Sequence, residues 1–320
     1  MSQKIIDVTI RDGGLVNNFD FSVEFVRDVY DALSRAGIDY MEIGYKNSPK
    51  LLKAESSGPW RFLKDDFLKE VIKQKTQTKL SCLVDVGRVD ENDILPREES
   101  LIDLVRVACY IHDVNKAIEL GERFHRLGYE TSVNIMALSN VMEHDLVEAL
   151  EELNKSSVDI VYVVDSFGNL LNQDIEYFVK LFKRHLPNKK LGIHTHNNLQ
   201  LAFSNTLVGL RNGVQYLDAS LYGMGRAAGN CPTELLFRVL KKSKYKIRPI
   251  LEVLQKRMIP LREKVEWGYT IPYALTGMFN EHPRSAMALR SSEDKDNYVD
   301  FYDRLTSVET HQDLISSSKK

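Results

Sequence analysis

The segment Leu191-Gly-Ile-His-Thr-His-Asn197 is the most informative stretch of this 320-residue chain. It has the pattern of an apolar β-strand that ends in two histidines. Because strand side chains alternate between the two faces of a sheet, His194 and His196 leave the strand on the same side. Two ligands of one metal ion need this arrangement. The segment therefore predicts a strand whose end binds a metal.

A second segment supplies a carboxylate for the same ion. Lys4-Ile-Ile-Asp-Val-Thr-Ile10 is another short strand-like run, and Arg11-Asp12-Gly13-Gly14 follows it. We expect Asp12 and the two histidines to hold one divalent cation, with positions left open for substrate as in catalytic metal sites. The adjacent glycines suit a close approach of the backbone to a ligand, which makes Gly13 a candidate substrate contact.

Short apolar runs alternate with amphipathic segments of helical length from residue 4 to about residue 240. The runs are Lys4–Ile10, Ile38–Tyr45, Lys79–Val86, Leu101–Tyr110, Thr131–Leu138, Asp159–Val164, Lys190–His196 and Val214–Tyr222. This alternation predicts βαβ units and a parallel sheet, and eight runs predict a (β/α)8 barrel. A doubly wound open sheet is the alternative. In such barrels, chemistry collects at the carboxyl ends of the strands.

The sequence predicts three of the connecting helices. Each of these helical segments ends at a glycine, as helices often do. These segments are Val23–Ala36, Asn115–Leu127 and Gln200–Asn212. In the first strand we expect Ile6, Val8 and Ile10 to face the helices, and Asp7, Thr9 and Arg11 to face the barrel interior. In the seventh strand we expect Gly192, His194 and His196 to point inward.

The alternation stops near residue 245. We therefore expect a catalytic barrel over residues 1–245 and a helical C-terminal extension over residues 246–320. Arg248–Lys264 and Asn297–Leu305 have helical patterns, and the aromatic segment 267–284 between them is rich in turn-forming residues.

Composition narrows the classes of partner. A net charge of −2 and a pI near 6.5 give no electrostatic reason to expect nucleic acid or an anionic membrane. Three cysteines without CxxC spacing indicate neither a disulfide framework nor a zinc knuckle, which favours a reducing compartment. The sequence carries no signal segment or membrane span, so we expect a cytoplasmic protein that acts on small molecules.

Three motifs in chain order resemble those of the DRE-TIM metallolyases. They are Asp7-Val-Thr-Ile-Arg-Asp-Gly13, His194-Thr-His-Asn197 and Leu221-Tyr-Gly-Met-Gly-Arg-Ala-Ala-Gly-Asn230. That superfamily includes 4-hydroxy-2-oxovalerate aldolase, hydroxymethylglutaryl-CoA lyase, and the isopropylmalate and homocitrate synthases. The chain is most similar in type to the oxovalerate aldolases. The resemblance implies a barrel in which Asp12, His194 and His196 bind a divalent metal, with Asn230 close to it either as a further ligand or as a hydrogen-bond partner of the ligands.

The resemblance also implies a catalytic role for Arg11 beside the metal, where its guanidinium would hold the oxygen that becomes an enolate. Glu42, in Met41-Glu-Ile-Gly44, would be a buried charge inside the barrel and needs a partner. Arg11 is the natural one, so Glu42 either orients Arg11 or forms a structural ion pair with it. Ser166, at the end of the sixth run, is a candidate substrate contact or a structural cap.

Positions at which this chain differs from the motifs of these relatives narrow the range of reactions that we expect it to catalyse. The condensing synthases carry a glutamate where this chain has Gly14, and the CoA lyase carries a cysteine inside the glycine loop, whereas Cys231 follows that loop. The aldolases carry a histidine where this chain has Leu15, so the proton acceptor must come from elsewhere. The C-terminal candidates are Tyr269 and His282 as catalytic groups and Tyr273 as a substrate contact. Tyr45 and Lys46 are alternatives.

These features predict a divalent-metal-dependent aldolase that cleaves or forms a carbon–carbon bond in a 4-hydroxy-2-oxo acid through a pyruvate-type enolate. The alternatives are a metal-dependent 2-oxo acid decarboxylase or carboxyltransferase, an acyl-CoA lyase or synthase of the same superfamily, and a noncatalytic metal-binding module. Mn²⁺ or Mg²⁺ is favoured, and Zn²⁺ or Co²⁺ also suits two imidazoles. The expected partners are a 2-oxo acid and an aldehyde, while a homodimer and an aldehyde dehydrogenase partner stay open.

Overall fold

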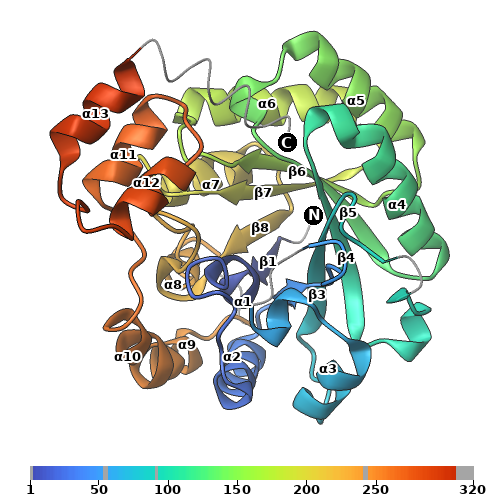
Figure 1. Cartoon of the computed structure of the whole chain (residues 1–320). Coiled ribbons are helices and arrows are strands. Elements are labelled where there is room, and N and C mark those ends of the chain that lie inside the picture. The colour runs from blue at the N-terminus through green and yellow to red at the C-terminus, as the bar shows by residue number, and fades with distance from the viewer. Residues whose placement is uncertain (1–2, 53–56, 91–92, 241–243, 308–320) are drawn as a thin grey trace.

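Eight parallel strands close into one barrel, with each strand beside its sequence neighbours and β8 beside β1 (Figure 1). The computed structural model describes residues 3–52, 57–90, 93–240 and 244–307. The strands are β1 (Lys4–Asp7), β2 (Tyr40–Tyr45), β3 (Lys79–Asp85), β4 (Ile102–Cys109), β5 (Glu130–Ile135), β6 (Ile160–Asp165), β7 (Lys190–Thr195) and β8 (Tyr216–Ala219). The predicted barrel is confirmed, and the open sheet is excluded.

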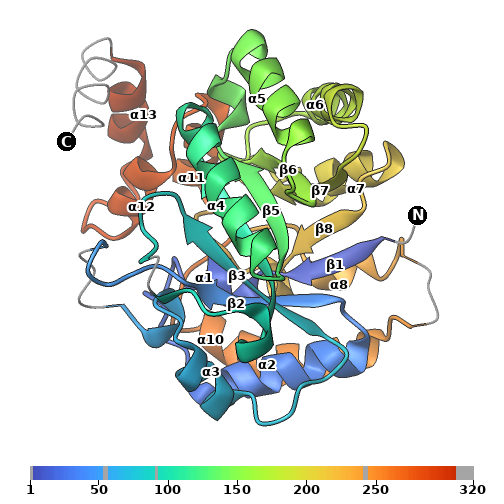
Figure 2. The same ribbon diagram turned by 90° about the vertical axis from the view of Figure 1, so that its right-hand side faces the viewer.

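Helices surround the barrel, as the views in Figures 1 and 2 show. They are α1 (Thr9–Gly13), α2 (Val23–Ala36), α3 (Asp65–Val71), α4 (Val114–Arg126), α5 (Glu143–Lys155), α6 (Asn172–His185), α7 (Ala202–Arg211) and α8 (Thr233–Leu236). The bounds of α2 agree with the prediction, and Gly37 ends this helix in the left-handed conformation with φ of 79°. The described residues between β3 and β4 contain no α-helix, and a 3₁₀ turn lies at Arg97–Glu99.

The first strand differs from its prediction. β1 ends at Asp7, and the next residues form the short helix α1. The backbone N–H of Thr9 donates to Oδ1 of Asp7 at 3.1 Å, which turns the chain out of the strand. As a result, Arg11 and Asp12 sit on a helix just beyond the end of β1.

The predicted faces of the first strand are wrong for Ile6, Val8 and Asp7. Ile6 and Val8 lie in the apolar cluster inside the barrel, whereas Asp7 points outward and accepts a hydrogen bond from Thr233 of α8 at 2.8 Å. The interior cluster comprises Ile6, Val8, Tyr40, Leu104, Ile160, Tyr162, Val164 and Tyr216. Both faces of a barrel strand are buried, so apolar residues alone do not reveal which face meets the helices. The prediction for β7 is confirmed, because a Cβ at Gly192 would clash with the interior ring of Tyr162.

The C-terminal region is helical, as predicted. It comprises α9 (Ile247–Val253), a π-helical turn (Leu254–Met258), α10 (Ile259–Arg262), α11 (Ile271–Met278), α12 (Arg284–Arg290) and α13 (Tyr298–Thr306). Helix α11 lies within the segment expected to be turn-rich, because Pro272 is tolerated in the first helical turn. The end of the expected extension, residues 308–320, lies outside the described residues, and the boundary at 245/246 stays a prediction.

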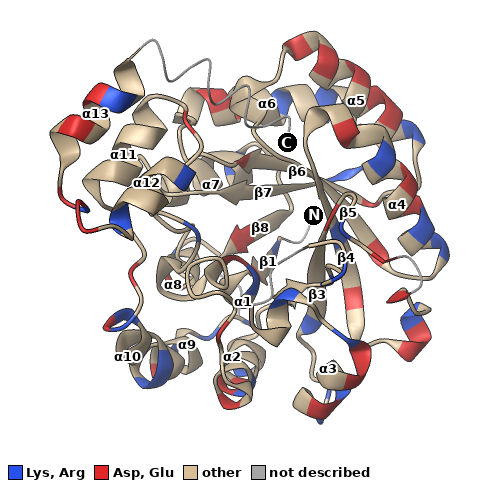
Figure 3. Ribbon diagram, viewed as in Figure 1, with Lys and Arg blue, Asp and Glu red and all other residues tan. Residues whose placement is uncertain are grey.

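Acidic and basic residues are mixed along outer helices such as α2 and α4, whereas α5 is mostly acidic (Figure 3). Among the described residues, no helix is long and apolar enough to cross a membrane. Cys82, Cys109 and Cys231 are buried and free. The prediction of a cytoplasmic location stays a prediction.

Candidate functional site

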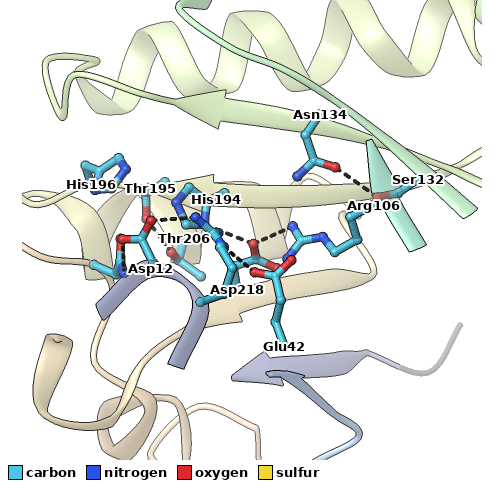
Figure 4. Close-up of polar contacts among 12 residues, drawn as sticks. Asp12, Glu42, Arg106, Ser132, Asn134, His194, Thr195, His196, Thr206 and Asp218 are labelled. Carbon is cyan, nitrogen blue, oxygen red and sulfur yellow. Dashed lines mark hydrogen bonds and ion pairs between the residues drawn. The ribbon is translucent and has the colours of Figure 1, made fainter. Parts of the chain in front are cut away.

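Three residues from separate parts of the chain meet at the carboxyl end of the barrel. Asp12 lies on α1, His194 on β7, and His196 directly after β7. One potential ligand atom of each lies within 4.8 Å of the others, and all three residues are buried (Figure 4). The convergence expected from the sequence is therefore present in the fold.

Hydrogen bonds fix the orientation of both imidazoles. Nδ1 of His194 lies 2.9 Å from Oδ2 of Asp218, and Nδ1 of His196 lies 3.2 Å from the carbonyl oxygen of Gly229. Both partners are acceptors, so each neutral ring carries its proton on Nδ1 and leaves the Nε2 lone pair free. In metal-binding histidines, the ring nitrogen that does not bind the metal ordinarily donates its proton to an acceptor of this kind.

Asn230 completes the same cluster. Its Nδ2 donates to Oδ2 of Asp12 at 2.9 Å and to the carbonyl oxygen of Met224 at 3.2 Å. Its Oδ1 is buried and has no hydrogen-bond partner among the described residues. A buried acceptor without a donor calls for a ligand. A Cβ at Gly225 would clash with both Asn230 and Asp12, so the glycine loop can follow this cluster only with glycine at this position.

The charge states of the cluster suit a cation. Burial would raise the pKa of the Asp12 carboxyl, but Arg11 and the imidazoles of His196 and His194 oppose this, and the pKa falls well below its usual range. Burial lowers the pKa of His196 well below its usual value, with a further contribution from Arg226. The cluster therefore offers a carboxylate and a neutral imidazole, the ligand forms that divalent metals bind.

The predicted pairing of Arg11 with Glu42 is present in the structure. Nε of Arg11 donates to Oε2 of Glu42 at 2.5 Å, and one of its terminal nitrogens donates to Oδ1 of Asp12 at 2.5 Å. The guanidinium also lies 5.9 Å from the ring of Tyr45. Glu42 is fully buried and thus sets the position of Arg11 beside the cluster.

Arg106 is a site residue that the sequence analysis missed. It lies inside the barrel on β4, donating to Oε1 of Glu42 at 3.0 Å and to Oδ2 of Asp218 at 2.6 Å. One buried guanidinium thereby connects the partner of Arg11 with the partner of His194 (Figure 4). The signal was available, since a single arginine inside the apolar run Ile102–Cys109 must find buried partners.

The wall of the barrel mouth is built by Arg226, Ser166 and His282. The backbone N–H of Arg226 donates to Oδ2 of Asp12 at 3.1 Å, and its guanidinium donates to the carbonyl oxygen of Ser166 at 2.7 Å. Nε2 of His282 lies 3.5 Å from another nitrogen of that guanidinium. The hydroxyl of Ser166 accepts a hydrogen bond from the backbone of Ala137 at 2.9 Å.

The remaining candidates lie farther from the cluster or are engaged elsewhere. Tyr273 is buried in the apolar cluster of the C-terminal helices, and Tyr269 is 48% exposed. Neither side chain has a hydrogen bond to the metal-ligand candidates within the described part of the chain. Lys46 is ion-paired with Asp65 at 2.5 Å. Of these candidates, His282 lies beside Arg226, and the roles expected of Tyr269 and Tyr273 stay predictions.

The two glycines after Asp12 have a packing role. A Cβ at Gly13 would lie 2.9 Å from Sδ of Met224, and a Cβ at Gly14 would overlap the ring of Phe19. The close approach that the sequence suggested therefore involves the protein's own side chains. The expected contact of Gly13 with substrate stays a prediction.

The residues present fit a divalent metal on three counts. Asp12, His194 and His196 are a mixed carboxylate and imidazole donor set, each imidazole presents its Nε2, and Asn230 adds an unpartnered oxygen. Such a set suits Mn²⁺, Co²⁺ or Zn²⁺, and Mg²⁺ where the substrate adds oxygen ligands.

Comparison with known proteins gives a consistent result. The HMGL-like family model matches residues 2–257 of this chain. The 4-hydroxy-2-oxovalerate aldolase of Thermus thermophilus is 29% identical over 290 residues, which cover 84% of this chain and 81% of the relative. The oxaloacetate decarboxylase of Mycobacterium tuberculosis is 29% identical over 241 residues, which cover 74% of this chain and 70% of the relative.

A solved structure agrees over nearly the whole chain. The crystal structure of the N-terminal domain of a protein from Bacteroides vulgatus, described as an aldolase, has a TM-score of 0.75 and 28% sequence identity. The match covers 91% of this chain and 98% of that domain. The similarity therefore includes both the barrel and most of the C-terminal helices.

Proposed function

Since the chain belongs to the HMGL-like family of enzymes, within the DRE-TIM metallolyases, we propose that it is a divalent-metal-dependent aldolase acting on 4-hydroxy-2-oxo acids. The reaction would release pyruvate and an aldehyde, or join them in reverse. The observation that carries this proposal is the convergence of Asp12, His194 and His196 beside the paired guanidinium of Arg11. The similarity to 4-hydroxy-2-oxovalerate aldolases supports it.

The roles of the residues follow from their positions. Asp12, His194, His196 and Asn230 would hold the metal, which supplies Lewis-acid polarisation of the 2-oxo group when bound. Arg11, fixed by Glu42, places a positive charge next to the position of that oxygen. As the bond between C3 and C4 breaks, its electrons form the double bond between C2 and C3, and the electrons of the carbonyl π bond move onto the C2 oxygen, where negative charge builds. A donor already held in place stabilises that charge without reorganisation.

The C4 hydroxyl must lose its proton while its oxygen becomes the aldehyde carbonyl, and C3 must then gain one to give pyruvate. Of the candidates for this transfer, Tyr45 lies against Arg11. His282 lies at the mouth, where its Nδ1 accepts from the backbone of Arg284, so it is placed to donate a proton rather than to accept one. Tyr45→Phe and His282→Gln, assayed separately, distinguish them, because loss of the proton carrier lowers kcat by about 100-fold or more.

Pyruvate release tests the proposal. Metal-loaded protein is incubated with 4-hydroxy-2-oxovalerate and related 4-hydroxy-2-oxo acids, and pyruvate is coupled to lactate dehydrogenase while the aldehyde is trapped in parallel. We expect equimolar pyruvate and aldehyde, abolished by a chelator and restored by Mn²⁺ or Mg²⁺. A folded, metal-loaded protein that cleaves none of these acids would contradict the proposal.

Decarboxylation of a 2-oxo diacid is the second candidate, and the similarity to the oxaloacetate decarboxylase favours it. When C4 of oxaloacetate leaves as CO₂, the electrons of the C3–C4 bond stay behind in the same pyruvate enolate. The same cluster could therefore stabilise the product of decarboxylation. Oxaloacetate therefore belongs in the assay, with CO₂ as the readout against the metal-only background.

A further inference from the structure

Three arginines bring guanidinium groups to the carboxyl end of the barrel, and they differ in their partners. Arg11 and Arg106 each contact two carboxylates, Arg11 with Asp12 and Glu42, and Arg106 with Glu42 and Asp218. Among the described residues, Arg226 forms no ion pair with an aspartate or glutamate, and its buried Nε has no hydrogen-bond partner. A half-buried guanidinium without an ion-paired carboxylate suits an anion supplied from outside.

The backbone fixes where this cation lies. The amide of Arg226 is tied to Asp12, and its guanidinium reaches the carbonyl oxygen of Ser166 just after β6. The loop holding Arg226 follows β8, and β7 lies between β8 and β6 in the barrel. The side chain therefore crosses the mouth over the end of β7, where His196 lies.

A second donor points at the same place. The backbone N–H of Arg284 donates to Nδ1 of His282 at 3.2 Å, so a neutral His282 carries its proton on Nε2. That Nε2 lies 3.5 Å from a guanidinium nitrogen of Arg226. Both atoms are donors and neither can accept from the other. An acceptor oxygen bridging them would satisfy both.

We propose that Arg226, together with His282, binds an anionic group on the aldehyde half of the substrate. This inference rests on the proposed function and narrows it to 4-hydroxy-2-oxo diacids, whose cleavage gives pyruvate and an aldehyde acid. Arg226 is then a specificity-determining residue. The metal cluster and Arg11 take the 2-oxo acid end, and Arg226 takes the far carboxylate.

The charge pattern of the mouth agrees with this division. Burial lowers the pKa of His282 to about 3, with contributions from Arg226 and Arg284, so its ring is neutral and serves as a donor at neutral pH. A neutral aldehyde half would leave the guanidinium of Arg226 desolvated and still unpaired. A site with unpaired polar groups discriminates strongly against a substrate that cannot satisfy them.

Two substrates matched in length test the inference. In 4-hydroxy-2-oxovalerate C4 carries a methyl group, and in 4-hydroxy-2-oxoglutarate it carries a carboxylate. 4-Hydroxy-2-oxoadipate, one methylene longer, is included as a second diacid. Since all three release pyruvate, one coupled assay gives kcat/KM for each. We expect wild-type protein to prefer one of the diacids by about 100-fold, the scale of a charge-assisted hydrogen bond.

Variants assign that preference to its residue. Arg226→Met should lower kcat/KM for the diacids about 100-fold more than for the neutral acid, and Arg226→Lys should keep part of the preference. Arg284→Met removes an exposed cation at the first residue of α12, two residues after His282, as a matched control, and should leave the preference unchanged. If Arg226→Met slows all substrates equally, the arginine binds the carboxylate that they share, and the inference is overturned. A wild-type preference for the neutral acid also overturns it.

A binding readout separates this inference from the proposed function. 2-Oxoglutarate and 2-oxovalerate lack the hydroxyl and cannot be cleaved, so calorimetry on the metal-loaded protein reports recognition alone. We expect wild type to bind 2-oxoglutarate about 100-fold more tightly than 2-oxovalerate. Arg226→Met should bind the two acids with about equal affinity. This result without any cleavage would sustain the inference and contradict the aldolase. Equal binding of both acids to wild type would overturn the inference whatever the activity.

Discussion

His194 and Asp218 share a hydrogen bond of 2.9 Å between Nδ1 and Oδ2, and that same carboxylate oxygen lies 2.6 Å from Arg106. Arg106 is also ion-paired with Glu42, which in turn is ion-paired with Arg11. Arg11 completes the chain with an ion pair to Asp12. A buried chain of charges thus joins two of the expected metal ligands around the barrel interior. The orientation of the imidazole therefore depends on residues that never touch the ion.

Asp218→Asn tests the orientation of His194. The amide keeps the shape of the side chain but loses its charge, so we expect metal affinity to fall by about 10- to 100-fold. Titration with Mn²⁺ followed by electron paramagnetic resonance measures it. Asp145→Asn, at an exposed position on α5, is the control. Unchanged affinity in a folded Asp218→Asn protein would show that this contact does not support the ligand.

Arg106→Met should destabilise the protein strongly. The change leaves Asp218 without its guanidinium partner and Glu42 with Arg11 alone, and breaking a buried ion pair in this way costs about 3–5 kcal/mol. Urea unfolding at pH 7 gives the free energy of unfolding. Arg211→Met, exposed on α7, should change it by less than about 0.5 kcal/mol. A loss for Arg106→Met as small as that of the control would contradict the role of this network.

Arg11→Ala should separate metal binding from turnover. The expected metal ligands Asp12, His194 and His196 are untouched, so the variant should still bind one ion per chain. Loss of the donor to the developing enolate oxygen should lower kcat by about 100-fold or more. Metal content by elemental analysis and kcat from pyruvate release give the two readings. Full activity in this variant would remove Arg11 from the mechanism.

Asp7 makes stability depend on pH. Burial raises the pKa of its carboxyl from 3.8 to about 6, although hydrogen bonds from Thr9 and Thr233 oppose part of the effect. Well below pH 3.8 the group is protonated in both states. As pH rises from about 3 to 7, the unfolded chain releases its proton first, so the contribution of Asp7 to stability falls by roughly 3 kcal/mol in total.

Asp7→Asn isolates this contribution, because the amide can still accept from Thr9 and donate to the hydroxyl of Thr233. We expect the variant to gain stability relative to wild type as pH rises from 4 to 7. Urea unfolding of both proteins at pH 4, 5.5 and 7 gives the difference. A difference that stays constant with pH would show that Asp7 titrates normally in the folded protein.

The sequence predicted the centre of the site because its signals are local. His194 and His196 alternate along one strand, and Asp12 comes soon after another apolar run. The carboxyl ends of strands in one barrel meet at the same end, and this was enough to bring the three residues together. The need of a buried Glu42 for a cation also predicted its pairing with Arg11. These inferences required only that the runs be strands of one barrel.

Other features depend on contacts that local pattern does not encode. The face of Ile6 could not be read because a barrel strand is apolar on both sides. His282 reaches the mouth only through the packing of the C-terminal helices. Arg226 was missed because the feature that distinguishes it is the lack of an ion-paired carboxylate among the described residues. That feature depends on the fold and does not appear in a sequence motif.

The central claim is that this metal cluster and Arg11 stabilise a pyruvate enolate. Exchange of the pyruvate methyl protons in D₂O tests this claim most directly, because the exchange passes through the enolate and needs no aldehyde. We predict that mass spectrometry will show deuterium incorporated into pyruvate by Mg²⁺- or Mn²⁺-loaded wild type, with none for apo protein or Asp12→Ala. Exchange that is equally fast in Asp12→Ala, or absent from folded wild type loaded with metal and saturated with pyruvate, would contradict the account.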